Sequence, residues 1–173
     1  MKWCFFASAC LIAVSVHAEG DTFLDSFSLG VGESRNQCDI YRLGLRKDSS
    51  SRWLSNDTGW LSMYYEASLN DWNKGAESVY GAACSPVFVY YFGAKESVVN
   101  PYVEAGIGVA CISETELGGR HFSTAFQFED RIGAGVRMKR ADFSIRYMHY
   151  SNGSLVEPND GIDIFIITAS YRL

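Results

Sequence analysis

After its first eighteen residues the chain contains no long hydrophobic run. No later segment approaches the roughly 20 apolar residues that a membrane-spanning helix requires. Any passage through a bilayer would therefore have to be made by strands. Strands can cross lipid only as a closed barrel, because every backbone N–H and C=O group must be hydrogen-bonded within the protein. The absence of long apolar runs leaves two classes open, a protein outside the membrane and a membrane β-barrel.

Positive charge and cysteine are also scarce. The chain has 15 Lys and Arg against 20 Asp and Glu, which argues against nucleic acid as a partner. Beyond residue 18 the cysteines are Cys38, Cys84 and Cys111. One pair could form a disulfide in an exported protein, but the odd number and the lack of a Cys-x-x-Cys motif argue against a disulfide framework or a zinc site. We expect small apolar side chains on strands, and the sequence leaves the disulfide state open.

The start of the chain has the pattern of a secretory signal peptide. A positively charged start precedes an apolar run over residues 3–16, and residues 16–18 read Val-His-Ala, a small-residue cleavage site. Cys10 would allow a lipoprotein interpretation, but the apolar run continues beyond it. We therefore divide the chain into a signal peptide, residues 1–18, and a single domain, residues 19–173.

What the sequence has in abundance is alternation of apolar and polar residues, the pattern of β-strands. The alternation is clearest over residues 122–138, where one parity is apolar and the other mostly polar. Asp130 is the one charged residue on the apolar parity and could mark a bulge or the membrane edge. Similar segments predict about eight strands in total. They cover residues 23–32, 41–46, 61–68, 79–92, 103–109, 122–138, 143–148 and 165–173.

The parity of the charged residues indicates what kind of β-protein this is. A membrane barrel shows its apolar face to lipid and turns polar side chains inward, whereas a soluble sheet does the reverse. Here both signs of charge lie on the polar parity, so they could pair inside a small barrel that is filled by side chains. We predict an all-β fold, an eight-stranded antiparallel transmembrane β-barrel, with a soluble barrel of the lipocalin type as the alternative. The charged residues are Arg42, Arg46, Glu66, Glu104, Glu129, Arg137 and Arg146.

An even number of strands places both ends of the barrel domain on the periplasmic side of the outer membrane. Residues 47–59, 112–121 and 150–162 are then expected as outer loops. Aromatic residues near the strand ends would suit the interfacial girdles of such a barrel. They are Tyr90, Tyr91, Phe92, Tyr102 and Tyr171.

The densest group of polar residues lies in segment 149–163, and part of it falls on the apolar parity. His149 and Ser151 are two residues apart on a strand, so they share a face, and their parity is that of lipid-facing Phe143. Asp163 begins the last strand with lipid-facing parity. Because the two strands form a hairpin, we expect Asp163 beside His149.

These residue types fit nucleophilic hydrolysis. A serine hydroxyl becomes a nucleophile when an imidazole takes its proton, and a carboxylate beyond the imidazole fixes the tautomer. Asn152, Asn159 and nearby backbone amides could donate hydrogen bonds to an oxyanion. Polar groups on a lipid-facing wall cost stability, which favours a functional interpretation. The alternative is that Ser-Asn-Gly and Asn-Asp-Gly only form turns.

These residues resemble the signature of the PagL family, outer-membrane lipid A 3-O-deacylases. The likeness lies in residues 149–152, which read His-Tyr-Ser-Asn, and residues 158–162, which read Pro-Asn-Asp-Gly-Ile. It extends through residues 126–128 and 132–138 and over the whole length. The resemblance implies an eight-stranded barrel with its active site on the outer wall, reached laterally by lipid. It also implies Ser151 as the nucleophile and His149 as the base.

Two positions depart from the family pattern. The third catalytic position is commonly Glu, whereas this chain has Asp163, one methylene shorter. After Asn152 the family usually has Ala-Gly, whereas Gly153 and Ser154 follow here. Gly153 would belong to the backbone part of the oxyanion site.

The resemblance predicts an enzyme that hydrolyses the ester-linked 3-hydroxyacyl chain of lipid A in lipopolysaccharide, with other outer-membrane lipids around it. The sequence offers no two His at ligand spacing and no cysteine pair, so we predict neither metal nor cofactor. A non-catalytic outer-membrane barrel, either an adhesin or a structural protein, and an outer-membrane phospholipase stay open as alternatives. A homodimer is also possible.

Overall fold

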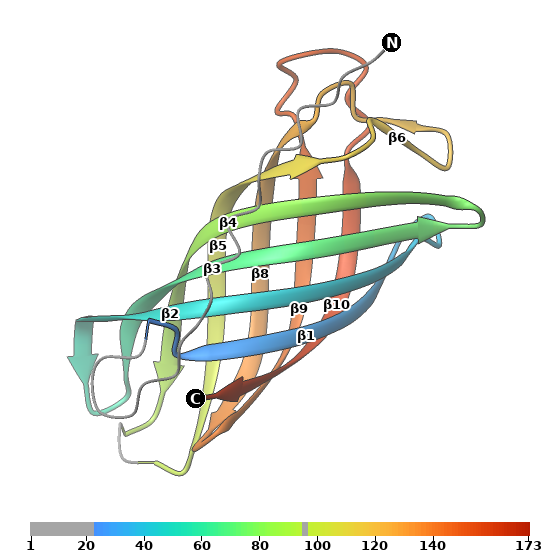
Figure 1. Cartoon of the computed structure of the whole chain (residues 1–173). Coiled ribbons are helices and arrows are strands. Elements are labelled where there is room, and N and C mark those ends of the chain that lie inside the picture. Colours follow the sequence, from blue (N-terminus) through green and yellow to red (C-terminus); the bar gives the residue numbers. More distant parts are fainter. Residues whose placement is uncertain (1–22, 95–96) are drawn as a thin grey trace.

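The computed structural model describes residues 23–94 and 97–173, and the predicted signal peptide, residues 1–18, lies outside them. The described residues form one closed antiparallel barrel in the order β1-β10-β9-β8-β5-β4-β3-β2 (Figure 1). The predicted all-β, eight-stranded barrel is confirmed. In the described ranges, no helix is long and apolar enough to cross a membrane.

Each predicted strand corresponds to one strand of the barrel. The barrel strands are β1 (Ser26–Ser34), β2 (Asp39–Asn56), β3 (Gly59–Lys74), β4 (Glu77–Phe92), β5 (Val99–Ile112), β8 (Phe126–Met138), β9 (Ala141–Ser151) and β10 (Ile162–Arg172). A small hairpin of β6 (Glu116–Leu117) and β7 (Arg120–His121) lies in the connection between β5 and β8.

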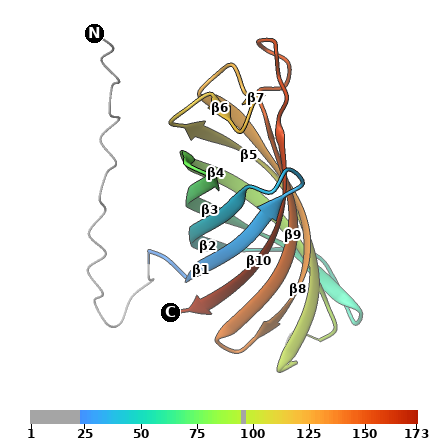
Figure 2. The ribbon, with the colours of Figure 1, turned by 90° about the vertical axis from the view of Figure 1, so that its right-hand side faces the viewer.

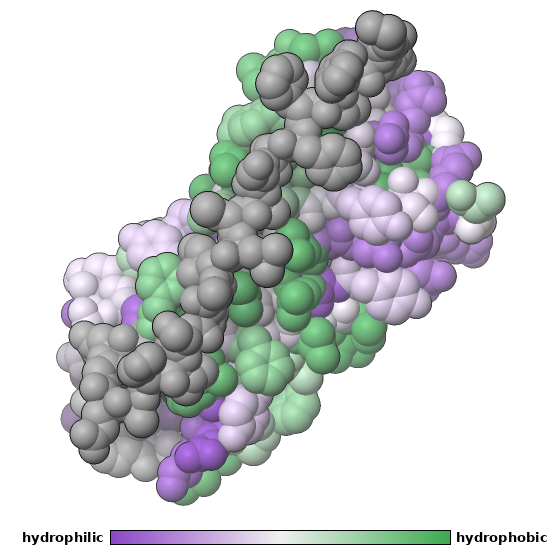
Figure 3. Space-filling view, viewed as in Figure 1, coloured by the Kyte–Doolittle hydropathy of each residue, from purple (hydrophilic) through white to green (hydrophobic). Residues whose placement is uncertain are grey.

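The outer wall of the barrel is apolar. Side chains alternate between the two faces of each strand, and large apolar side chains such as Ile145 and Ile167 are about 60% exposed. On the face that Figure 3 shows, hydrophobic residues lie along the middle of the wall and hydrophilic residues gather toward one end. An exposed apolar surface of this extent is unusual for a soluble protein and is the surface that lipid solvates in a membrane barrel.

Inside the barrel, arginine and glutamate side chains form a buried network that lies alongside two clusters of buried apolar and aromatic side chains. Arg42 donates hydrogen bonds to Glu66 at 2.9 Å and to Glu129 at 2.9 Å. Arg131 donates to Glu66 at 2.8 Å and also contacts Glu129. Charges can be buried only where opposite charges and hydrogen bonds compensate them. The predicted pairing of opposite charges inside the barrel is therefore confirmed.

The same network holds strand β9 from the inside. Arg146 on β9 donates to Glu104 at 2.6 Å, and Tyr150 on β9 donates to Glu129 at 2.6 Å. Tyr150 also accepts a hydrogen bond from Arg42 at 2.8 Å. Buried polar side chains that are hydrogen-bonded to several partners hold the strands that carry them in place. The inward side chains of β9 thus fix the strand that carries His149 and Ser151.

The predicted outer loop at residues 47–59 is wrong. Strand β2 continues through most of this range to Asn56, and only a tight turn at residues 57–58 follows, at the same end of the barrel as the C-terminus (Figure 1). The pairing with β3 shifts register between Asp48 and Arg52. Residues 47–52 are polar on both faces, so they show no alternation, although a bulge keeps them in the sheet.

The other two predicted outer loops meet at the opposite end of the barrel. The β5–β8 connection contacts the β9–β10 connection, where Asp160 N donates to His121 O at 3.1 Å and Ser123 Oγ donates to Pro158 O at 2.6 Å. The predicted strand 122–138 starts later, at Phe126. Phe122 is buried against Trp72 rather than exposed to lipid, because positive φ at Ser123 turns the chain before the strand begins.

Two further expectations are resolved by side-chain positions. Tyr91 and Tyr102 do not form an outer girdle: both are buried inside the barrel, where Tyr102 donates to Asp142 at 2.6 Å. All three described cysteines are free. Cys84 and Cys111 are exposed on neighbouring strands β4 and β5, as expected for small side chains on a wall, whereas Cys38 is buried beside the turn after β1.

Replacing Glu129 with alanine should destabilise the barrel strongly, because Arg42 and Arg131 would each lose a buried carboxylate partner. We expect a loss of about 3–5 kcal/mol in the free energy of unfolding, measured by urea titration in lipid vesicles. Glu114→Ala, at an exposed position of the β5–β8 connection, is the control and should cost less than about 0.5 kcal/mol. Equal losses in the two variants would contradict the interpretation of the interior network.

Candidate active site

The β9–β10 hairpin brings the predicted site residues together on the outer wall. The two strands pair without interruption, and His149 is the register partner of Asp163. Along β9 the side chains of Met148 and Tyr150 are buried inside, whereas His149 and Ser151 point outward and are half-buried. Figure 2 shows β8, β9 and β10 side by side, with the β9–β10 connection beyond the end of the barrel.

A hydrogen bond joins the imidazole to the carboxylate. His149 Nδ1 and Asp163 Oδ1 are 2.8 Å apart, and the two side chains are 37% and 30% exposed. An ionised carboxylate only accepts hydrogen bonds, so Nδ1 carries the proton in this contact. Nε2 is therefore left as the acceptor nitrogen in the neutral ring, which is the arrangement that a general base requires.

Tyr147 is a third member of this group that the sequence reasoning missed. Its hydroxyl donates to Asp163 Oδ1 at 2.7 Å, and its ring packs on Phe165 with centroids 5.1 Å apart. Asp163 Oδ1 therefore accepts from both Tyr147 and His149. The signal was present in the sequence, because Tyr147 has the parity of His149 and lies two residues before it. Parity alone, however, indicates only a lipid-facing aromatic residue at this position.

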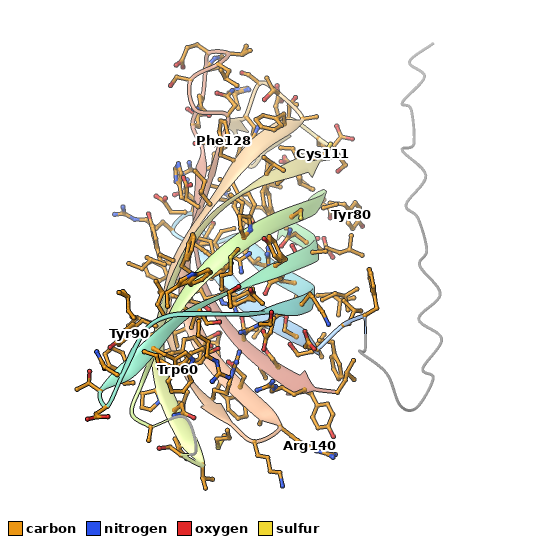
Figure 4. All side chains as sticks on the ribbon, turned by 90° about the vertical axis from the view of Figure 1, so that its left-hand side faces the viewer. Trp60, Tyr80, Tyr90, Cys111, Phe128 and Arg140 are labelled. Carbon is orange, nitrogen blue, oxygen red and sulfur yellow. The ribbon has the colours of Figure 1, made fainter. Side chains whose placement is uncertain are left out.

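Ser151 is the last residue of β9 and lies on the same face as His149. Its register partner is Phe128 on β8, labelled in Figure 4 near the upper end of the barrel. Over the described ranges its Oγ makes no hydrogen bond, and none joins it to His149. Catalytic hydrogen bonds often tighten only when substrate binds. The hydroxyl of Ser151 and the imidazole of His149 thus lie on one face of β9, but no hydrogen bond joins them in this structure.

His149 has a second carboxylate on its other side. In the pairing of β8 with β9, Asp130 is the register partner of His149, as Asp163 is in the pairing with β10. Register is continuous through Asp130 on both edges of β8, so it marks no bulge. The order of outward side chains across the sheet is therefore Asp130, His149 and Asp163.

The β9–β10 connection is anchored by Asn152, which is fully buried. Its Nδ2 donates to Phe122 O at 2.9 Å and to Val156 O at 2.7 Å, and its backbone N–H donates to Asn159 Oδ1 at 3.1 Å. Every N–H group of Asn152 is thus used to hold the loop. Two other predicted oxyanion donors, Asn159 Nδ2 and the Gly153 N–H, have no partner among the described residues.

The lack of a side chain at Gly161 leaves room for the imidazole of His149. Its φ is +57°, and a Cβ there would lie 3.0 Å from His149 Cε1 and 2.9 Å from Tyr150 O. Glycine adopts positive φ without steric cost, and its lack of a side chain permits close approach. In addition, Arg120 Nη1 donates to Gly161 O at 2.7 Å, which ties this position to the β5–β8 connection.

The described side chains offer no group of three or more His, Cys, Asp or Glu that could hold a metal ion. The chemistry available at this site from the chain itself is that of a hydroxyl, an imidazole and a carboxylate. This set of groups can activate a nucleophile and shuttle its proton.

Comparison with known proteins agrees with this fold and identifies the family. Residues 39–172 match the family model described as lipid A 3-O-deacylase (PagL). This chain belongs to the PagL family. The lipid A deacylase PagL of Pseudomonas aeruginosa is 38% identical over 154 residues, 87% of each chain. That of Bordetella bronchiseptica is 28% identical over 174 residues, 96% of this chain and 90% of the relative.

A solved member of the PagL family has the same barrel. The crystal structure of the outer membrane enzyme PagL matches with a TM-score of 0.81 at 36% identity, over 86% of this chain and 99% of that chain. A closed barrel with an apolar outer wall is also the only strand architecture that lipid tolerates. The predicted outer-membrane localisation is therefore confirmed.

The carboxylate of Asp163 reaches the imidazole although this position departs from the pattern that the resemblance implies. Asp163 is one methylene shorter than the glutamate that is common at this position, but it reaches His149 Nδ1 at 2.8 Å. The direct register pairing of these two residues makes the shorter side chain sufficient.

Adding a methyl group at Gly161 should disable the site while the barrel stays folded. The Cβ in Gly161→Ala would displace the imidazole, and a displacement near 1 Å can lower the rate about a hundredfold. Hydrolysis of an acyl ester by protein folded in detergent measures the effect. Gly75→Ala is the matched control, because Gly75 has a φ of +63° but nothing within 4 Å of its Cβ position. An equal loss of activity in both variants would refute the steric explanation.

Proposed function

We propose that this chain hydrolyses the 3-O-linked acyl ester of lipid A in the outer leaflet, with Ser151 as nucleophile, His149 as base and Asp163 as the orienting acid. The observation that carries the proposal is the His149–Asp163 contact of 2.8 Å on the lipid-facing wall, on the same face as Ser151. Membership of the PagL family supports the choice of lipid A as the substrate.

The proposed reaction has two halves. Ser151 Oγ attacks the ester carbonyl carbon while His149 Nε2 takes the hydroxyl proton, and the resulting imidazolium is stabilised by Asp163. The tetrahedral intermediate collapses when the sugar oxygen leaves with that proton, and an acyl-serine remains. Water then attacks the acyl-serine while His149 takes its proton, and the imidazolium returns that proton to Ser151 Oγ as the fatty acid is released.

Asp163 and Tyr147 act together in this scheme. A carboxylate that accepts hydrogen bonds from both the Tyr147 hydroxyl and His149 Nδ1 is held in one orientation. The imidazole is then kept in the tautomer that presents Nε2 to the serine. Tyr147 acts through Asp163 and is therefore a positioning residue.

For the oxyanion we propose the Gly153 N–H and Asn159 Nδ2 as donors. Asn159 Oδ1 accepts from Asn152 N at 3.1 Å, which orients the amide and leaves its NH2 group available. Positive φ at Gly153 (+64°) turns the backbone directly after Ser151 and Asn152. Preorganised donors of this kind contribute much of the rate in acyl transfer. In this proposal Asn152 supports the oxyanion site by holding the loop.

The position of the site at the end of the barrel wall suits a lipid ester. Acyl esters of a membrane lipid lie where its polar headgroup meets its apolar chains. Ser151 ends β9, with the apolar wall on one side of it and the polar β9–β10 connection on the other. A lipid that diffuses laterally can therefore present its ester to Ser151 without leaving the leaflet.

Loss of the nucleophile should abolish deacylation. In a Gram-negative host, wild-type protein should remove one 3-hydroxyacyl group from lipid A, as read by mass spectrometry, and Ser151→Ala should slow this by about 10⁴-fold or more. Ser154→Ala is the control, because Ser154 is exposed in the same connection and its side chain makes no hydrogen bond with any described residue. Unchanged lipid A with wild-type protein correctly inserted, or release of fatty acid from phosphatidylethanolamine alone, would contradict the proposal.

Weakening the Asp163 contacts should give graded effects. Asp163→Asn removes the charge that stabilises the imidazolium and should lower kcat about 10³- to 10⁴-fold. Tyr147→Phe removes one hydrogen bond to the carboxylate and should lower kcat about tenfold. In both variants KM should change little, since neither group contacts the substrate. Asp163→Glu should retain most activity, and a Tyr147→Phe loss as large as that of Asp163→Asn would contradict the division of roles.

A further inference from the structure

Arg120 belongs to β7, outside the β9–β10 hairpin, but its side chain is bonded to the connection of that hairpin. Its Nη1 donates to Asp160 O at 3.1 Å and to Gly161 O at 2.7 Å. These are the last two carbonyl groups before β10 begins at Ile162. Arg120 therefore holds the backbone directly before the strand that carries Asp163.

The hairpin of β6 and β7 gives Arg120 a fixed base, at the same end of the barrel as the β9–β10 connection (Figure 2). The chain reverses at Gly118 and Gly119, whose φ angles of +58° and +77° suit a two-residue hairpin turn. Leu117 before this turn and Phe122 after β7 are both fully buried in the apolar cluster at this end of the interior. The residues on both sides of Arg120 are thus anchored in the barrel.

Backbone hydrogen bonds join the two connections beside Arg120. Asp160 N donates to His121 O at 3.1 Å, and His121 N donates to Asp160 Oδ2 at 2.7 Å. The bonds from His121 attach Asp160, and the bond from Arg120 to Gly161 O extends the attachment to the residue that faces the imidazole.

The position of Gly161 bears directly on His149. A Cβ built on Gly161 would lie 3.0 Å from His149 Cε1 and 3.5 Å from Nε2. Gly161 therefore faces the edge of the ring that carries the nitrogen which, in the proposed reaction, takes the proton of Ser151. Glycine has a wide conformational range, so a contact from another segment is needed to keep Gly161 in one position.

Loss of the Arg120 side chain should change the site more than the stability of the barrel. Arg120 is half-buried, so water can donate hydrogen bonds to the two carbonyl groups in its place, although water does not fix their position. The guanidinium forms no ion pair with any described residue. Its removal therefore leaves no buried carboxylate without a partner.

We propose that Arg120 is a positioning residue for the proposed reaction, and that it acts through Gly161 to keep the imidazole of His149 directed toward Ser151. The inference rests on the proposed function. Acyl transfer requires the reacting groups to be closely aligned, and a displacement near 1 Å can lower the rate about a hundredfold.

The first test measures kcat and KM for purified lipid A, with full-length mature protein folded in detergent micelles and the loss of one 3-hydroxyacyl group read by mass spectrometry. Arg120→Ala should lower kcat about ten- to a hundredfold. KM should stay unchanged, because Arg120 contacts the backbone and not the substrate. Millimolar guanidinium chloride should restore part of kcat in this variant, since the free cation can bind the same two carbonyl groups.

Arg140→Ala is the matched control. Arg140, labelled in Figure 4, lies at the opposite end of the barrel, where its Nη1 donates to the Tyr171 hydroxyl at 3.1 Å. Its replacement should leave kcat at the wild-type value, with and without guanidinium. If Arg120→Ala does not fold, the kcat of Arg120→Met decides, because methionine keeps an apolar stem and lacks the donor.

A double-mutant cycle distinguishes positioning from a general loss of structure. Gly161→Ala already displaces the imidazole, so adding Arg120→Ala to it should lower kcat by less than about twofold further. Two effects that multiply would show that Arg120 does not act through Gly161, and would overturn the inference.

The remaining outcomes separate this inference from the proposed function. Wild-type protein that does not deacylate lipid A would contradict the proposed function itself. An active wild type with an equally active Arg120→Ala, or a raised KM at unchanged kcat, would overturn the role of Arg120 and leave the proposed function standing. A lower kcat at unchanged KM, restored by guanidinium and absent from the Gly161→Ala background, would support it.

Discussion

Alternation of side chains across a single closed sheet is the constraint on which this structure depends. Lipid requires an apolar outer wall, so the polar residues of every strand must be accommodated inside. The arginines and glutamates there compensate each other, with Arg42 and Arg131 both contacting Glu66 and Glu129. The network shares the interior with buried apolar clusters, and each of its members depends on its partners being present.

The same alternation produces the candidate active site, because the residues of β9 between the inward-facing ones point to the outer wall. Arg146 and Tyr150 of β9 are bonded inside the barrel, which leaves His149 and Ser151 between and beyond them on the outer wall. Sites carried on strands are positioned more accurately than sites on loops. The one loop that takes part, the β9–β10 connection, is held by three hydrogen bonds from Asn152. The interior contacts of β9 thus hold the strand in place, while its outward side chains, His149 and Ser151, face the lipid.

A period of two can be read directly from a sequence, and it predicted the barrel, its strand number and the shared face of His149, Ser151 and Asp163. It could not predict the course of the chain where both faces are polar, as at residues 47–56, which belong to β2 through a bulge. Nor could it place Phe122, because a turn at Ser123 shifts the phase before β8 begins.

Side-chain contacts between neighbouring strands were harder to predict than the face of the sheet on which each residue lies. The register that sets Asp130 beside His149 depends on the lengths of the turns, and the Tyr147–Asp163 hydrogen bond depends on that register as well. Tyr91 and Tyr102 read as girdle residues because an aromatic side chain with one polar atom suits either a membrane interface or a polar interior. Their burial distinguishes these locations, and inside the barrel Tyr102 donates to Asp142 while Tyr91 accepts from Arg46. Nor could spacing predict that every Asn152 N–H is used in structural hydrogen bonds, two of them within the loop and one to Phe122.

The central claim is that an outward-facing serine is activated by the neighbouring imidazole on the lipid side of the wall. Trapping with a lipid-soluble phosphonate ester tests it most directly, since such a reagent forms a stable adduct only with an activated serine. Peptide mass spectrometry of protein folded in detergent should locate one adduct, on Ser151, and His149→Ala should prevent its formation. An adduct on a different serine, or labelling of Ser151 that is unaffected by the loss of His149, would contradict the account.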